Sequence, residues 1–212
     1  MKLKKVNSKY YNSLFNEYGH STKSLGWKGK SNDYRFKCLI ENFEIKNNSI
    51  LDVGCGLGHL IKFLGKKKFK YTGIDINKNF IKVNKLKFKK NYKFFDKDIF
   101  KLDENQNFDY VIQNGLLNLK IPNVNKYHQS ELLLKKMFKL ANIGASCNFL
   151  SSNAKIKYKK NNYFAPEKIL KICYKLTNNV LLKNNYFPYE FSVTLFKEVK
   201  IKPDSHFINL KL

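Results

Sequence analysis

The chain has 212 residues and a mass of 25.0 kDa, which suffices for one well-buried α/β domain with a small cap but leaves little room for two independent domains. Its formal net charge is +25, and lysine accounts for every basic residue except Arg35. No N-terminal apolar stretch and no run of membrane-spanning length occurs, so the sequence supports neither secretion nor membrane insertion, and we expect a cytoplasmic protein.

The basic charge has two interpretations. Lysine-rich surfaces attract phosphate chains by counterion release, which favours an anionic partner such as a nucleic acid. Lysine, asparagine, phenylalanine and tyrosine are all frequent, however, and an AT-rich genome produces that composition whatever the function. Arginine, which proteins that read nucleic acids use for bidentate contacts, occurs once. We therefore favour compositional drift, with an anionic partner as the alternative.

The cysteines indicate neither a disulfide framework nor a metal site. Cys38, Cys55, Cys147 and Cys173 lie far apart in the sequence without paired spacing. We expect reduced, mostly buried thiols and no bound metal.

The first 45 residues predict a helical cap. Tyr10 and Tyr11 belong to a short amphipathic helix, and the turn-rich segment that follows contains the only tryptophan, Trp27. An aromatic loop before the first strand predicts a lid over a ligand site, although a surface loop pinned by Trp27 fits equally well. A helix from Asn32 to Phe43 then leads to the first strand.

The central feature of the chain is a strand, a glycine turn and a helix. The apolar run from Ile50 breaks into Gly54, Gly56 and Gly58, and a helix to Leu64 follows. Glycines at these positions can take positive φ and let a ligand lie against the backbone. Free N–H groups of the helix then face that ligand. A second strand ends at Asp75, about 20 residues after the first glycine, where a carboxylate can bind a ribose diol.

The rest of the chain alternates helices and strands, as a doubly wound sheet requires. The predicted elements are a helix at 77–88, strands at 91–95 and 108–115, a helix at 127–140, a strand at 144–150, a loop at 151–164, a helix from 166 to about 176, and strands at 180–182 and 191–198. The last two strands predict an antiparallel hairpin at the sheet edge. We expect residues 46–212 to form a single structural unit.

These motifs resemble the cofactor motifs of class I S-adenosylmethionine-dependent methyltransferases. The resemblance is carried by Asp52-Val53-Gly54-Cys55-Gly56-Leu57-Gly58 and by Gly73-Ile74-Asp75. A dinucleotide fingerprint spaces its last two glycines by two residues, whereas this turn spaces them by one. The resemblance implies a Rossmann-like, doubly wound seven-stranded sheet that is mostly parallel with an antiparallel C-terminal strand. It also implies S-adenosylmethionine as cofactor and S-adenosylhomocysteine as product.

The resemblance also assigns cofactor-binding residues. Asp98-Ile99 after the third strand fits the family's adenine motif, with Asp98 favoured over Asp96. Arg35 is similar in position to an arginine that holds the cofactor's methionine carboxylate in several family members; the alternative is an exposed helix arginine paired with Asp33 or Glu41. The full assigned set is Trp27, Arg35, Asp52, Gly54, Gly56, Gly58, Asp75, Ile76, Asp98, Ile99 and Gln113.

Catalytic residues are less defined than cofactor residues. Methyl transfer from a sulfonium depends mainly on positioning, so it needs little acid or base assistance when the acceptor is already nucleophilic. The chain reads Gln113-Asn114-Gly115-Leu116 where base and amide nitrogen methyltransferases carry an Asn/Asp-Pro-Pro-aromatic box. His128 and Glu190 are weak candidates for a general base, each better explained as a structural or solvent-facing residue.

Three functions remain compatible with the sequence. The favoured one is methylation of a small, anionic acceptor such as a sugar, phosphorylated or nucleotide-linked metabolite. The alternatives are an RNA methyltransferase and a non-catalytic protein that binds S-adenosylmethionine. No appended RNA-binding module is visible, which favours the small acceptor over nucleic acid. The oligomeric state is left undetermined by the sequence.

Overall fold

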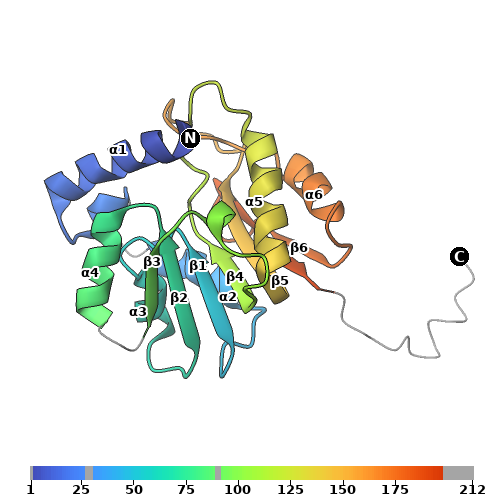
Figure 1. Cartoon of the computed structure of the whole chain (residues 1–212). Helices are drawn as coiled ribbons and strands as arrows, with labels where there is room; N and C mark the ends of the chain where they lie inside the picture. The colour runs from blue at the N-terminus through green and yellow to red at the C-terminus, as the bar shows by residue number, and fades with distance from the viewer. Residues whose placement is uncertain (1, 27–30, 89–91, 198–212) are drawn as a thin grey trace, which may run out of the picture.

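The computed structural model describes residues 2–26, 31–88 and 92–197 (Figure 1). Seven strands form one sheet in the order β3-β2-β1-β4-β5-β7-β6. The strands are β1 (Ser49–Val53), β2 (Lys70–Asp75), β3 (Lys93–Asp96), β4 (Phe108–Gln113), β5 (Ala141–Leu150), β6 (Val180–Lys183) and β7 (Glu190–Phe196). The order reverses between β1 and β4, where doubly wound sheets open a crevice at the carboxyl ends of their strands.

Helices cover both faces of the sheet (Figure 1). One face carries α2 (Ser31–Ile40), α3 (His59–Leu64) and α4 (Lys78–Phe88), and the other carries α5 (Lys126–Leu140) and α6 (Pro166–Tyr174). Successive residues of a strand point to opposite faces, and β1 follows this rule: Ile50 packs under α2 and α3, whereas Leu51 packs under α5. Both residues are buried, so adjacent positions of this strand are apolar.

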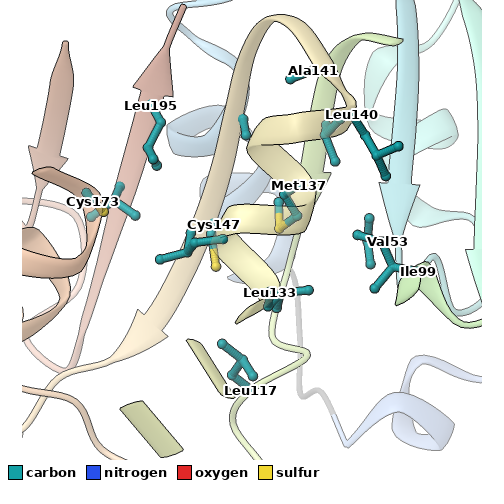
Figure 2. Close-up of a cluster of buried hydrophobic side chains, with 14 of the residues drawn as sticks. Val53, Ile99, Leu117, Leu133, Met137, Leu140, Ala141, Cys147, Cys173 and Leu195 are labelled. Carbon is teal, nitrogen blue, oxygen red and sulfur yellow. The ribbon is translucent and has the colours of Figure 1, made fainter. Parts of the chain in front are cut away.

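The larger core lies between the sheet and the pair α5 and α6. Figure 2 shows Leu133 and Met137 of α5 near Val53 and Cys147 of the sheet, and Leu195 of β7 near Cys173 of α6. All four cysteines are free and buried, as the spacing predicted. Within the described residues, no helix is long and apolar enough to cross a membrane.

Strand β7 runs antiparallel to both β5 and β6, so the predicted hairpin at the sheet edge is confirmed. The seven-stranded, mostly parallel fold is confirmed with it. Because β7 is reversed, its first residue, Glu190, lies opposite Leu150 at the carboxyl end of β5. The start of β7 thus faces the same edge of the sheet as the glycine turn after β1.

The N-terminal helix lies across this edge. Helix α1 (Lys2–Tyr18) and the 3-10 helix η1 (Thr22–Leu25) stand above the carboxyl ends of the strands (Figure 1). Tyr11 and Phe15 of α1 meet the ring of Phe80 in α4, with ring centroids 6.4 and 5.7 Å apart. A second 3-10 helix, η2 (Ile99–Lys101), follows β3 and has no counterpart in the sequence-based prediction.

Candidate functional site

The glycine turn after β1 requires glycine at each of its three positions. Gly54, Gly56 and Gly58 have φ angles of 73°, 50° and 69°, in the left-handed region that side chains disfavour. A Cβ on Gly56 would lie 2.8 Å from Cδ2 of Leu25 in η1. The turn therefore presents bare backbone to the space beneath η1.

Asp75 sits at the end of β2 and faces the same turn. Its carboxylate accepts hydrogen bonds from the backbone N–H groups of Gly56 at 3.0 Å and Asn77 at 2.8 Å. Burial raises the pKa of Asp75 to about 6, while these N–H groups oppose the shift. Each carboxylate oxygen keeps a lone pair for a ligand hydroxyl, so the geometry agrees with the predicted ribose contact.

Asp52 lies behind the turn, where it is 4% exposed. Its Oδ2 accepts a hydrogen bond from the Tyr71 hydroxyl at 2.7 Å. Burial raises the pKa of Asp52 to about 7; the Tyr71 bond opposes this shift and the charge of Asp75 adds to it. Two carboxyl groups therefore share one poorly solvated region beside the glycine turn.

A pocket opens between the turn, the lid and the end of β4. From the sequence-predicted set it brings together Asp52, Gly54, Gly56, Asp75 and Ile76. Tyr11 of α1 and Leu25 of η1 also line it, so residues of the N-terminal segment lie at this pocket. Trp27, the residue on which the lid was predicted, lies outside the described residues.

Sequence reasoning missed several lining residues, most of them from elements that only the fold brings to the glycine turn. They are Tyr11, Leu25, Asn32, Phe36, Cys55, His59, Phe80, Asn114, Gly115 and Leu116. Cys55 and His59 carried a local signal, because Cys55 lies within the glycine turn and His59 directly follows its last glycine. The others come from α1, η1, α2, α4 and the loop after β4, which share no motif with the turn.

Two lining side chains hold buried polar atoms without a partner among the described residues. They are Oδ1 of Asn32 and Nδ1 of His59. Burial and the charges of Lys87 and Lys62 lower the pKa of His59 to about 4, so its imidazole is neutral at pH 7. A buried polar atom without a hydrogen bond is costly. The pocket thus fits a polar ligand that supplies these bonds.

Gly58, Asp98, Ile99 and Gln113 belong to the predicted cofactor set but are not among the residues that line the pocket. Asp98 is half-buried and caps η2, accepting a hydrogen bond from the Phe100 backbone N–H at 3.2 Å. Ile99 is buried in the core under α5. Gln113 is fully buried, with its amide 3.0 Å from the Cys147 thiol. The adenine role of Asp98 and Ile99 and the cofactor contact of Gln113 stay predictions.

Arg35 forms a buried ion pair with Glu190, which lies 155 residues away in the sequence. Its Nε and Nη2 atoms bond both carboxylate oxygens at 2.5–2.9 Å, and Nη1 donates to Ser31 at 2.8 Å. Arg35 is 5% exposed and Glu190 2%, so the alternative of an exposed arginine paired with Asp33 or Glu41 is wrong. The α2 residues that line the pocket are Asn32 and Phe36, and Arg35 is directed toward β7.

The two weak candidates for a general base, Glu190 and His128, have different surroundings. The carboxylate of Glu190 is engaged by Arg35. His128 is exposed in the first turn of α5, in a shallow surface depression shared with Glu131 and lysines of α6. These surroundings favour a structural role for Glu190 and a solvent-facing position for His128.

The chain matches the sequence model of a family described as "Methyltransferase domain" over residues 44–189. The match begins just before β1 and ends at the residue preceding β7. It therefore spans the glycine turn, Asp75 and the loop after β4.

Individual relatives differ in their named substrates. The chain is 31% identical over 106 residues to ribosomal RNA small subunit methyltransferase A of Mesomycoplasma hyopneumoniae, and it spans less than half of that protein, 41%. It is 28% identical over 158 residues to a putative methyltransferase of Mycobacterium tuberculosis, covering 93% of it. Magnesium protoporphyrin IX methyltransferase of Synechocystis PCC 6803 has a similar structure, with a TM-score of 0.68, 14% identity, and coverage of 92% of this chain and 100% of that one.

Proposed function

We propose that this chain, which belongs to the methyltransferase-domain family, transfers a methyl group from S-adenosylmethionine to a small anionic metabolite, such as a sugar, phosphorylated or nucleotide-linked compound. The sulfonium cofactor supplies an activated methyl group. The protein's contribution is to bind the cofactor, hold the acceptor in line with the methyl group and exclude water.

The residues around the pocket fit this cofactor. Asp75 can accept hydrogen bonds from the ribose hydroxyls, and the bare backbone at Gly54 and Gly56 allows the ligand to lie close. The unpartnered atoms of Asn32 and His59 can bind the polar methionyl end. Tyr11 and Leu25 cover the pocket and shield it from solvent.

We expect Asp75→Ala to weaken S-adenosylmethionine binding by about 1–3 kcal/mol, because the ribose hydroxyls lose a charged acceptor. The Gly56 N–H also loses its acceptor, so part of the loss comes from the turn itself. Isothermal titration calorimetry measures the change, with thermal unfolding as the check that the variant folds. An unchanged dissociation constant in a folded variant removes Asp75 from the site.

The observation that supports an anionic acceptor is a lysine-rich loop beside the pocket. Residues 151–164 include Lys155, Lys157, Lys159 and Lys160, all exposed. The loop is joined to the segment after β4, since the backbone of Lys120 bonds that of Lys160 at 2.8 Å. It also reaches the lid, because Lys160 Nζ lies 3.5 Å from the Tyr10 hydroxyl. We call these four residues the rim lysines.

No carboxylate offsets the rim lysines from within their own loop. Between Asp109 and Glu190 the sequence holds only two acidic residues, Glu131 and Glu167, which lie in α5 and α6. Glu131 already pairs with Lys175 at 2.8 Å. An acceptor approaching the pocket from this side meets a uniformly positive loop, which raises the local concentration of anions.

Changing the four rim lysines to glutamine is expected to lower the rate of methyl transfer to a metabolite extract about ten-fold or more at low ionic strength. The matched control changes Lys46, Lys66, Lys67 and Lys68, which are exposed at the opposite edge, where β1 and β2 begin. Labelled S-adenosylmethionine reports the transfer. Equal losses in both variants would show that the charge acts diffusely and that the rim lysines have no special role.

RNA methylation is the second candidate, favoured by the similarity to the ribosomal RNA methyltransferase and by the net charge. Diffuse lysine charge predicts weak RNA binding that fades steeply near physiological salt. Labelled cofactor offered separately to total RNA and to the metabolite extract distinguishes the two acceptors. Labelling of RNA alone, with binding that survives physiological salt, would replace the small acceptor with RNA.

A further inference from the structure

Two asparagines meet at the floor of the pocket beside the end of β4. Asn114 lines the pocket directly after β4, and Asn148 is 2% exposed in the neighbouring strand β5. Asn148 Nδ2 donates to Asn114 Oδ1 at 2.9 Å, and Asn148 Oδ1 accepts from the Gly115 backbone N–H at 2.7 Å. Both polar ends of the Asn148 amide are therefore engaged.

This arrangement fixes the orientation of both amides. The Gly115 N–H can only donate, so the atom of Asn148 that faces it must be the oxygen. The Asn148 amide nitrogen then faces Asn114, whose own oxygen must point back to accept from it. In the part of the chain that the structure describes, no acceptor bonds Asn114 Nδ2. The two N–H donors of the Asn114 amide are therefore left for a ligand in the pocket that Asn114 lines, while its oxygen is engaged by Asn148.

We propose that Asn114 binds a negatively charged oxygen of the acceptor and that the methyl group is transferred to that oxygen. This inference rests on the proposed function and adds the acceptor atom to it. An amide N–H stabilises an oxyanion by a charge-assisted hydrogen bond. A neutral amine has a single lone pair, which must attack the methyl group, so only N–H groups would remain to face this donor during the transfer. Asn148 is the positioning residue, since it acts through Asn114.

The reaction of an oxyanion needs no general base. A lone pair of the acceptor oxygen forms the new C–O bond, the C–S bond of the sulfonium breaks, and its electron pair stays on sulfur. The acceptor loses its negative charge and the sulfonium its positive charge, so no proton moves. This agrees with the engagement of Glu190 by Arg35 and with the exposed position of His128, because neither supplies a base.

The bond formed can be read directly from the product. S-adenosylmethionine with a 13C-labelled methyl group is incubated with the enzyme and a metabolite extract, and the product is examined by proton–carbon correlation NMR. We expect the label as O-methyl. Label as N-methyl or C-methyl would overturn the inference while leaving the small-acceptor function intact. Label in RNA alone would instead overturn that function.

A binding experiment tests the inference independently of turnover. The protein loaded with S-adenosylhomocysteine is titrated with benzoate or with benzylamine, and the side-chain amide resonance of Asn114 is followed by 15N NMR, assigned by its absence in Asn114→Ala. We expect benzoate, but not benzylamine, to shift this resonance. A response to benzylamine alone, or to neither probe, contradicts the oxyanion assignment.

Charge substitutions separate the role of the donor from general electrostatics. Asn114→Asp keeps an acceptor for Asn148 but presents a carboxylate to the pocket, so benzoate binding should weaken about ten-fold or more, as should O-methyl formation. Asn153→Asp adds the same charge at an exposed position of the 151–164 loop and should change benzoate binding less than two-fold. Asn148→Leu, which frees Asn114 to rotate, should reduce the discrimination between benzoate and benzylamine. Equal effects of the two aspartate variants would refute a specific contact at Asn114.

Discussion

Replacing Glu190 with alanine is expected to lower the free energy of unfolding by about 3–5 kcal/mol, because the buried Arg35 guanidinium loses the carboxylate that neutralises it. Burial alone disfavours the charged form of Glu190 and raises its pKa, while Arg35 opposes the shift. The two buried charges are therefore stabilised by each other and not by hydration. Urea unfolding measured at equilibrium gives the loss.

The control for this substitution removes both charges together. Arg35→Met combined with Glu190→Leu should recover most of the lost stability, since apolar residues of similar volume often replace a buried ion pair without cost. A double variant as unstable as Glu190→Ala would mean that packing around the two side chains, including the contact of Arg35 with the Phe187 ring at 5.2 Å, matters more than the charge.

The same pair bears on cofactor binding through α2. Sequence comparison with the family assigned Arg35 to the methionine carboxylate, but the structure directs its guanidinium at Glu190. We therefore expect Arg35→Lys to weaken the binding of S-adenosylmethionine and of methylthioadenosine equally, by loosening the helix that carries Asn32 and Phe36. A loss confined to S-adenosylmethionine, the ligand that has the carboxylate, would instead support a direct contact between Arg35 and that carboxylate.

Asp52→Asn is expected to stabilise the ligand-free protein at pH 8 by about 2–4 kcal/mol and to have almost no effect near pH 4. The pKa of Asp52 is raised from 3.8 to about 7 in the folded protein. Its neutral form therefore stabilises the fold fully below pH 4, and this contribution is lost as the pH rises through 7. Asparagine cannot ionise, and its oxygen can still accept the Tyr71 hydrogen bond.

Thermal unfolding of both proteins from pH 4 to pH 8 measures this difference. The gap between variant and wild type should widen across that range and level off above pH 7. A gap independent of pH would assign the effect to something other than ionisation. Asp109→Asn should change stability in the opposite direction. Hydrogen bonds from Ser49 lower the pKa of Asp109 despite its partial burial, so this variant should be less stable than the wild type above pH 4.

We also expect Asp52→Asn to weaken cofactor binding, which would explain why a carboxyl group occupies a site where it destabilises the free protein. Functional sites often contain residues that lower the stability of the free protein. Calorimetry with S-adenosylmethionine measures the affinity. Unchanged affinity would leave the buried carboxyl without a role in binding.

The sequence by itself determined the fold class and the half of the site that is local. Alternating helices and strands predicted the doubly wound sheet, because a strand buried on both faces must be apolar along its length. The glycine spacing and Asp75 predicted the ligand turn, since three positive φ angles at Gly54, Gly56 and Gly58 can be read from residue type. These features depend on neighbours within about 25 residues.

Only the tertiary structure decided what surrounds that turn. Arg35 and Glu190, 155 residues apart, become an ion pair because β7 is inserted antiparallel beside β5 and brings Glu190 to the carboxyl edge. Asn114 and Asn148 meet because β4 and β5 are adjacent parallel strands whose register pairs Gln113 with Cys147, the residue before each asparagine. A side chain's hydrogen-bond partner is set by strand order and register, and neither is encoded in the residues next to it.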